Sequence, residues 1–313
     1  MSLTTGIELE LLLPPGMTRM DLLERLRAFT GGQVQPFEFP SKVPVPHPAR
    51  AGLEGEAAIQ ACLAAMQDIA AHHQARLHSI RPDGQFFYLS HRCGRLVDEH
   101  GMTLLEVVHD NTLAGGERVA EVITPPLAPE QADWLAALIA QLAAVPGIEV
   151  PPRAALHVHV DGKALCDAET LARLVALYLD HEALLRRWLH TPTGLHADRR
   201  MPHALLRSLH AGVGQPWEQV RPTLARALPD NCCGLNLYNL AHDRRDKLTV
   251  ELKLAAASLD PAWVLAVRAL FVALVELALA CDVDLPRDAA ALVHAIDPAD
   301  RIVPVLAGAA RAP

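Results

Sequence analysis

Apolar and polar positions alternate with a period of two in several short stretches of the chain. Near the N-terminus, apolar Ile7 and Leu9 alternate with acidic Glu8 and Glu10. This spacing predicts a strand with both glutamates on one face, because successive side chains of a strand point to opposite sides. The same reasoning predicts strands over residues 6–13, 86–90, 104–109, 119–124, 154–160 and 248–254.

Between these strands, apolar positions recur at helical spacing. The pattern predicts helices over residues 18–29, 56–77, 130–145, 168–190 and 201–210, and a last long helix that starts after Asp260-Pro261. An Asp followed by Pro is a typical helix start. The helices differ greatly in length and do not alternate regularly with strands, as they would in a doubly wound sheet. We therefore expect an α+β protein with a mostly antiparallel sheet and helices packed on one side.

The domain organisation follows from the same patterns. Residues 1–296 are expected to form a single catalytic domain. Prolines crowd residues 31–53, which we expect to be a loop, with residues 36–48 as a lid or an irregular loop. Residues 297–313 are rich in Ala and Pro and are expected to form a loosely ordered C-terminal tail.

Composition narrows the class of protein. Of 313 residues, 51% are hydrophobic and 20% are charged, which is enough apolar material for a large core. The net charge of -8 argues against nucleic acid as a partner, because phosphate binding favours a basic surface. The six cysteines contain no CxxC pair, and the N-terminus lacks the basic start of a signal peptide. The longest apolar stretch contains Arg268 and Glu276, which argues against a membrane span. We expect a cytoplasmic protein without a membrane partner.

Carboxylates and imidazoles recur on the predicted strands. Glu8 and Glu10 lie about 7 Å apart on one face of a strand, so they repel each other unless a cation lies nearby. Carboxylate oxygens are the ligands that Mg²⁺ prefers, and one imidazole is compatible with such a set. The candidate residues are Glu8, Glu10, Glu121, His157, His159, Glu251 and Lys253. Taken singly, an ExE strand is more often a solvated face, and an HxH strand is equally typical of zinc binding or of an exposed strand.

Several of these segments together resemble a known family. They are GIELEL at 6–11, DNTL at 110–113, AEVITPPL at 120–127, LHVHVDG at 156–162, and NLYN followed by LTVELKLAAASLDP within 236–261. In this order they resemble the motifs of the amidoligase family over roughly residues 6–280. The resemblance implies a fold similar to the catalytic sheet of glutamine synthetase. It also implies an ATP-dependent carboxylate–amine ligase that acts through an acyl phosphate, with ATP and Mg²⁺ (or Mn²⁺) as cofactors.

The resemblance also implies roles for individual residues. The metal ligands would be Glu8, Glu10, Glu121, His157 and Glu251; the ATP-binding residues His159, Arg199 and Lys253; and the catalytic residues Lys253, Glu251 and Arg200. Lys253 stands where the family usually has arginine, so the charge is kept but the bidentate grip on phosphate is lost. Arg199 or Arg200 would then share that task. The substrates would be a carboxylate and an amine from an amino acid, a peptide or a related small molecule, with the oligomeric state open.

Two other functions remain open at this point. One is a zinc-dependent hydrolase that uses His157 and His159, with His109 as a further ligand. The other is a non-catalytic binding protein on a degenerate ligase scaffold, for which Lys253 is the hint in the sequence.

Overall fold

The computed structural model describes residues 2–44, 55–72, 75–80, 86–110, 113, 115–193, 199–228, 230–242 and 247–308. The chain forms two compact units. The first unit comprises Met1–Leu9, Pro126–Ala144 and Pro152–Pro313, and the second comprises Glu10–Pro125 and Val145–Pro151. A single catalytic domain over residues 1–296 stays a prediction.

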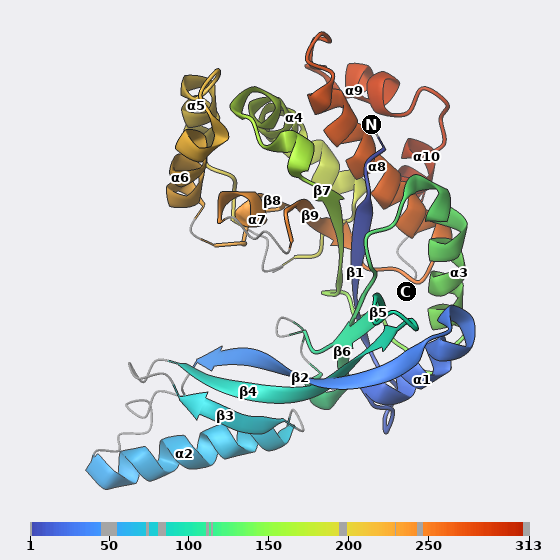
Figure 1. Cartoon of the computed structure of the whole chain (residues 1–313), viewed down its shortest axis with the longest axis vertical. Coiled ribbons are helices and arrows are strands. Elements are labelled where there is room, and N and C mark those ends of the chain that lie inside the picture. Colours follow the sequence, from blue (N-terminus) through green and yellow to red (C-terminus); the bar gives the residue numbers. More distant parts are fainter. Residues whose placement is uncertain are drawn as a thin grey trace. The chain divides into compact units, whose positions relative to one another are not determined.

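The first unit contains antiparallel strands in the order β1, β7, β9 and β8. Their bounds are Thr5–Leu12 for β1, Ala155–Asp161 for β7, Thr249–Ala256 for β9 and Leu235–Asn236 for β8. Figure 1 shows β7 next to β1. In register, Glu8 of β1 faces His157 of β7, and His159 of β7 faces Glu251 of β9. The register therefore brings the acidic and imidazole positions of three strands onto neighbouring sites.

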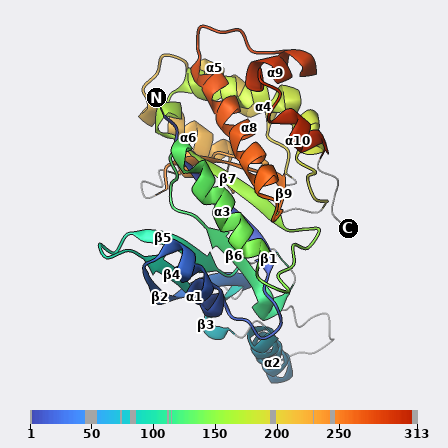
Figure 2. The same ribbon diagram turned by 90° about the vertical axis from the view of Figure 1, so that its right-hand side faces the viewer.

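Helices enclose the apolar side of these strands. The helices of the first unit are α3 (Ala132–Ala143), α4 (Ala168–Trp188), α5 (His203–Ala211), α6 (Trp217–Ala227), α7 (Tyr238–Ala241), α8 (Pro261–Leu279), α9 (Ala289–Ile296) and α10 (Val303–Gly308), with short 3₁₀ turns at Pro129–Gln131 and Lys163–Leu165. Helix α8 contacts β7, α3 and α4, and Figure 2 shows α3 and α8 running beside each other in front of β7. Val158 and Leu252, at most 1% exposed, lie in the core.

Helix α8 is long and apolar enough, by length and composition, to cross a membrane; its mean hydropathy reaches 2.2. Yet 56% of that stretch is buried inside the protein. Arg268, in the middle of α8, is buried and donates hydrogen bonds to Thr5 Oγ1 at 2.6 Å and to the Ala128 carbonyl at 2.9 Å. The packing of α8 is thus that of a core helix of the first unit.

The second unit contains antiparallel strands in the order β2, β4, β5, β6 and β1, with β3 also paired to β4. Their bounds are β2 (Gln33–Pro44), β3 (Arg76–Ile80), β4 (Phe86–Val97), β5 (Thr103–Val108) and β6 (Val119–Ile123), with a 3₁₀ turn at Gly116–Arg118. Helix α1 (Arg19–Thr30) contacts β4 and β5, and α2 (Gly55–His72) contacts β3. Strand β1 is common to both units. The α+β class and the antiparallel pairing are confirmed.

The expected proline-rich loop over residues 31–53 is wrong for its first part. Residues 33–44 form strand β2, which pairs along its whole length with β4. Proline lacks an N–H, so it normally interrupts a strand. Pro36, Pro40 and Pro44 lie four residues apart and therefore point their nitrogens to the same side. Among the described strands β2 ends the strand order, so one of its sides pairs with no other strand, and a sheet tolerates proline on that side because no ladder hydrogen bond is needed there. The rest of the expected lid, residues 45–48, lies outside the described residues.

The expected loose tail is also wrong as far as residue 308. Asp297 is buried, and its carboxylate accepts hydrogen bonds from the backbone N–H groups of Arg301, Ile302 and Val303, each at 2.7 Å. This bonding fixes the turn that leads into α10, whose Leu306 is fully buried. Small apolar residues that look uncommitted in sequence thus form a docked helix. Residues 309–313 lie outside the described part of the chain.

Candidate active site

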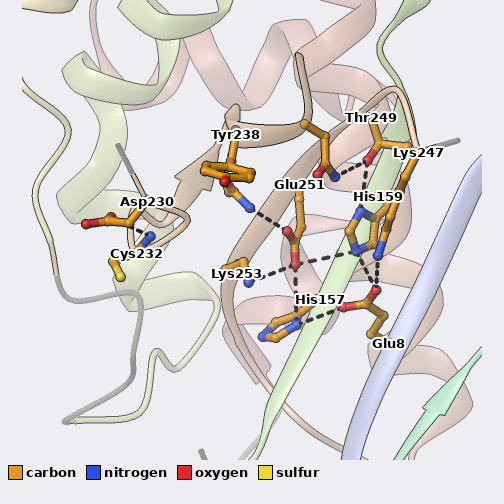
Figure 3. Close-up of polar contacts among 12 residues, drawn as sticks. Glu8, His157, His159, Asp230, Cys232, Tyr238, Lys247, Thr249, Glu251 and Lys253 are labelled. Atoms are coloured by element: carbon orange, nitrogen blue, oxygen red, sulfur yellow. Dashed lines mark hydrogen bonds and ion pairs between the residues drawn. The ribbon is translucent and has the colours of Figure 1, made fainter. Parts of the chain in front are cut away.

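The candidate site lies in the first unit, on the side of β1, β7 and β9 that faces away from α8. Glu8, His157 and Glu251 come from three adjacent strands, and their side chains converge (Figure 3). Their neighbours in sequence, such as Ile7 and Val158, are at most 1% exposed and belong to the core. The alternation along each strand therefore separates a core face from a polar face, as the sequence pattern indicates.

Both imidazoles lie between the two carboxylates. His157 Nδ1 is 3.4 Å from Glu8 Oε2 and 3.4 Å from Glu251 Oε1. His159 Nε2 is 3.0 Å from Glu8 Oε1 and 3.4 Å from Glu251 Oε1. All four side chains are nearly buried, with exposed fractions between 4% and 12%. Charges in such a place interact more strongly than in water.

Each carboxylate also contacts a lysine. Lys247 Nζ lies 2.6 Å from Glu8 Oε1, and Lys253 Nζ lies 3.2 Å from Glu251 Oε1. The two lysines differ in exposure: 42% of the Lys247 side chain is exposed, but only 11% of the Lys253 side chain. The carboxylates therefore lie among basic groups on strands β7 and β9 and just before β9.

Side-chain amide and hydroxyl groups form hydrogen bonds with two members of this cluster. Asn236 Nδ2 donates a hydrogen bond to Glu251 Oε2 at 2.7 Å, and Asn236 Oδ1 accepts one from the Tyr238 N–H at 2.9 Å. Thr249 Oγ1 lies 3.1 Å from His159 Nδ1 and accepts a hydrogen bond from Asn239 Nδ2 at 3.0 Å. These contacts orient Glu251 and His159 with respect to the other members of the cluster.

The basic neighbours keep both carboxylates ionised. Burial alone raises the pKa of Glu8, but His159, His157 and Lys247 outweigh it, so that the pKa lies well below its usual range. For Glu251, burial and the charge of Glu8 raise the pKa, while the imidazoles and Lys253 lower it, and the net direction is downward. Two ionised carboxylates therefore share a nearly buried site.

This donor set fits a divalent cation. Glu8, His157 and Glu251 each offer one ligand atom, and these atoms lie within 4.8 Å of one another. Glu251 Oε1 and His159 Nε2 are buried, and within the described part of the chain their partners are ion pairs and not well-aligned hydrogen bonds. A cation could therefore take up bonding capacity that these contacts leave unused. Two carboxylates and one imidazole favour a hard ion such as Mg²⁺ or Mn²⁺ over zinc.

Glu10 and Glu121 belong to the second unit. Glu10 is 2% exposed, and it and Glu121 each place a carboxylate oxygen within 4.8 Å of the other. Carboxylates so close repel each other unless a proton or a cation lies nearby. The expectation that this pair shares a metal site with Glu8, His157 and Glu251 stays a prediction. His109, the additional ligand considered for zinc, is also in the second unit, where its ring stacks on His91 at 3.7 Å.

The two arginines lie on the segment before α5. Arg199 forms an ion pair with Asp230 and is half exposed, while Arg200 is exposed. Burial and Asp230 raise the pKa of the Cys232 thiol, whereas Arg199 and Lys253 lower it. Cys232 thus lies within electrostatic reach of both Arg199 and Lys253. The roles expected for Arg199 in ATP binding and for Arg200 in catalysis stay predictions.

Lys247 and Asn236 are members of the cluster to which the sequence analysis assigned no role, although Asn236 begins the NLYN segment of the family resemblance. Lys247 has the same parity as Thr249, Glu251 and Lys253, so extending the alternation by two residues would have found it. Asn236 is separated from Glu251 by 15 residues, and only the pairing of β8 with β9 joins them.

Comparison with known families agrees with this geometry. A family model described as "Putative amidoligase enzyme" matches residues 1–270. The chain belongs to the amidoligase family. The resemblance of the strand motifs is thereby confirmed, and the match includes every strand that contributes to the cluster. No curated protein and no solved structure matches the chain. A likeness of this amidoligase to glutamine synthetase therefore stays a prediction.

Proposed function

We propose that this amidoligase is an ATP-dependent carboxylate–amine ligase whose divalent cation is held by Glu8, His157 and Glu251. The observation that carries the proposal is the nearly buried set of two ionised carboxylates and one imidazole on adjacent strands. Family membership supports amide formation as the reaction class. The cofactors proposed are ATP and Mg²⁺, or Mn²⁺ in its place.

In this proposal the substrate carboxylate attacks the γ-phosphorus of ATP, and ADP leaves. The amine then attacks the acyl carbon, phosphate leaves, and the amine loses a proton as the amide forms. A bound divalent cation would neutralise the charge on the transferring phosphoryl oxygens. The residues of the chain would place these charges around the phosphoryl group. Glu8, His157 and Glu251 would bind the cation, and Lys253 would supply a positive charge beside them.

Further residues would bind the nucleotide and a second cation. His159 Nε2 faces the same carboxylates and would meet the nucleotide from β7. Arg199 and Arg200 would contact phosphate from the segment before α5, and Glu10 and Glu121 would supply a further cation site. We also propose a cytoplasmic location, a small-molecule or peptide carboxylate and amine as substrates, and neither nucleic acid nor a membrane as a partner.

The test is to incubate the protein with ATP, Mg²⁺ and a library of amino acids and peptides, and to follow ADP and new amides by mass spectrometry. Glu251→Gln keeps the shape of the side chain and removes its charge. Loss of groups behind a metal ligand costs about 10- to 100-fold, so removal of a direct ligand should lower ADP formation about 100-fold or more.

Glu276→Gln is the matched control, because Glu276 is exposed on α8. It should leave turnover unchanged. Equal ADP formation by the parent and by Glu251→Gln, with the same Mg²⁺ dependence, would contradict the proposal. Stoichiometric bound zinc in the purified protein, with no ATP-dependent product, would support the hydrolase instead.

A further inference from the structure

Each of the two carboxylates in the cluster already has an ammonium group against it before any cation arrives. Glu8 and Glu251 supply two negative charges, and Lys247 and Lys253 place an ammonium group against each of them, at 2.6 Å and 3.2 Å. A divalent ion bound to the same carboxylates would add two positive charges to a nearly buried place. Like charges at such distances repel strongly when water is largely excluded. Departure of one ammonium group from its carboxylate relieves this repulsion when the ion binds.

Lys247 is the lysine placed to leave. It lies just before the first residue of β9, outside the paired part of the strand, and 42% of its side chain is exposed. Lys253 lies within β9, and only 11% of its side chain is exposed. The long, flexible stem of lysine lets its ammonium group move several ångströms without any change in the backbone.

We propose that Lys247 takes the place of the cation on Glu8 and moves to the phosphate chain of the nucleotide when the divalent ion binds. This inference rests on the proposed function of the site. Binding of the ion frees the positive charge that the incoming nucleotide requires, so the site favours the ion and the nucleotide together. Lys247 is thus a residue that couples cation binding to nucleotide binding.

If Lys247 and the divalent cation exchange places on Glu8, the Lys247→Met variant should change the two affinities in opposite directions. Without the competing ammonium group, the divalent ion alone should bind more tightly. Without the donor, the nucleotide should bind less tightly. If Lys247 only stabilises the fold, these opposed changes are not expected, because loss of fold would weaken the binding of both ligands.

The experiment titrates the full-length protein with Mn²⁺ alone, and then with a non-hydrolysable ATP analogue at saturating Mg²⁺. For Lys247→Met we expect Mn²⁺ to bind about threefold more tightly, the scale of a partly exposed ion pair. We expect the ATP analogue to bind about tenfold more weakly, the scale of a charge-assisted hydrogen bond. Lys163→Met is the matched control, because Lys163 is an exposed lysine beyond the end of β7; it should change neither affinity.

Two failures are distinguishable. If the parent binds both ligands and Lys247→Met binds Mn²⁺ no more tightly, or binds the ATP analogue as well as the parent does, the exchange is wrong and the proposed function stands. If the parent itself binds neither Mn²⁺ nor the ATP analogue, the proposed function fails, and the exchange fails with it. The melting temperature of Lys247→Met should equal that of the parent. A change in either affinity then reflects the binding site and not a loss of fold.

Discussion

Asn236 and Glu251 are opposed residues on β8 and β9, and the amide of Asn236 donates a 2.7 Å hydrogen bond to Oε2 of Glu251. The Tyr238 N–H, bonded to Asn236 Oδ1, fixes which way the amide points. Oε2 is thereby occupied, and Oε1 is left facing His157, His159 and Lys253. The short strand β8 thus selects the oxygen that Glu251 offers to a cation.

Asn236→Ala should therefore weaken cation binding while the fold survives. Groups behind a metal ligand typically contribute 10- to 100-fold in affinity, and we expect a loss of about tenfold in Mn²⁺ affinity, measured by calorimetry. Asn231→Ala, at an exposed position of the same unit, is the control. Parental Mn²⁺ affinity in Asn236→Ala would show that the amide serves the packing of β8 alone.

Lys253 allows a test of the departure from the family pattern. It lies two residues after Glu251, hence on the same face and about 7 Å along the strand. Lys253→Arg should keep or raise ADP formation, because a guanidinium can grip phosphate with two hydrogen bonds. Lys253→Met should lose most of it. Equal rates for the parent and Lys253→Met, at saturating ATP and Mg²⁺, would remove Lys253 from the mechanism.

Arg268 joins α8 to β1 and should matter for stability. Arg268→Met keeps much of the stem but leaves Thr5 Oγ1 and the Ala128 carbonyl without this donor. A buried polar group that loses its partner costs about 1–3 kcal/mol, and we expect the free energy of unfolding in urea to fall by about that amount. Arg287→Met, at an exposed position, should leave it unchanged. An equal loss in both variants would mean that Arg268 contributes only charge.

Asp297 should make the free energy of unfolding depend on pH in the acidic range. Burial raises the pKa of its carboxyl group, but hydrogen bonds from three backbone N–H groups outweigh burial, and the pKa lies below its ordinary 3.8. The ionised form therefore stabilises the folded chain above pH 3.8, and this contribution is lost as the pH falls through the lower, folded-state pKa. Asp297→Ala should cost about 1 kcal/mol at neutral pH.

Urea unfolding of the parent and of Asp297→Ala, measured from pH 7 downward, checks this dependence. The difference between their free energies of unfolding should be constant above pH 3.8 and shrink below it. A difference that instead grows as the pH falls would contradict the sign of the shift.

Much of the fold follows from alternation, and the exceptions have physical causes. Strands β1, β5, β6, β7 and β9 were predicted within two residues at each end, because each has a buried face. Strand β2 was missed because its prolines look like loop residues unless the strand is known to form an edge. Strand β3 was partly assigned to the preceding helix, since the apolar pattern continues through the end of α2 at His72.

For the site, too, the sequence predicted some features and not others. Glu8, His157, His159, Glu251 and Lys253 could be proposed because each belongs to a strand whose alternation marks its face. Their mutual contacts required the register of β1, β7 and β9, which local patterns do not determine. Asn236 begins the NLYN segment of the family resemblance, but its contact with Glu251 could not be predicted, because β8 has only two residues and no alternation of its own.

The prolines of β2 also affect how this protein meets other chains. An edge strand normally presents a row of N–H groups with which a strand of another molecule can pair. In β2, Pro36, Pro40 and Pro44 remove every second donor from that row. A foreign strand laid along this edge would find too few hydrogen bonds to continue the sheet, so the prolines protect the folded protein against edge-to-edge aggregation.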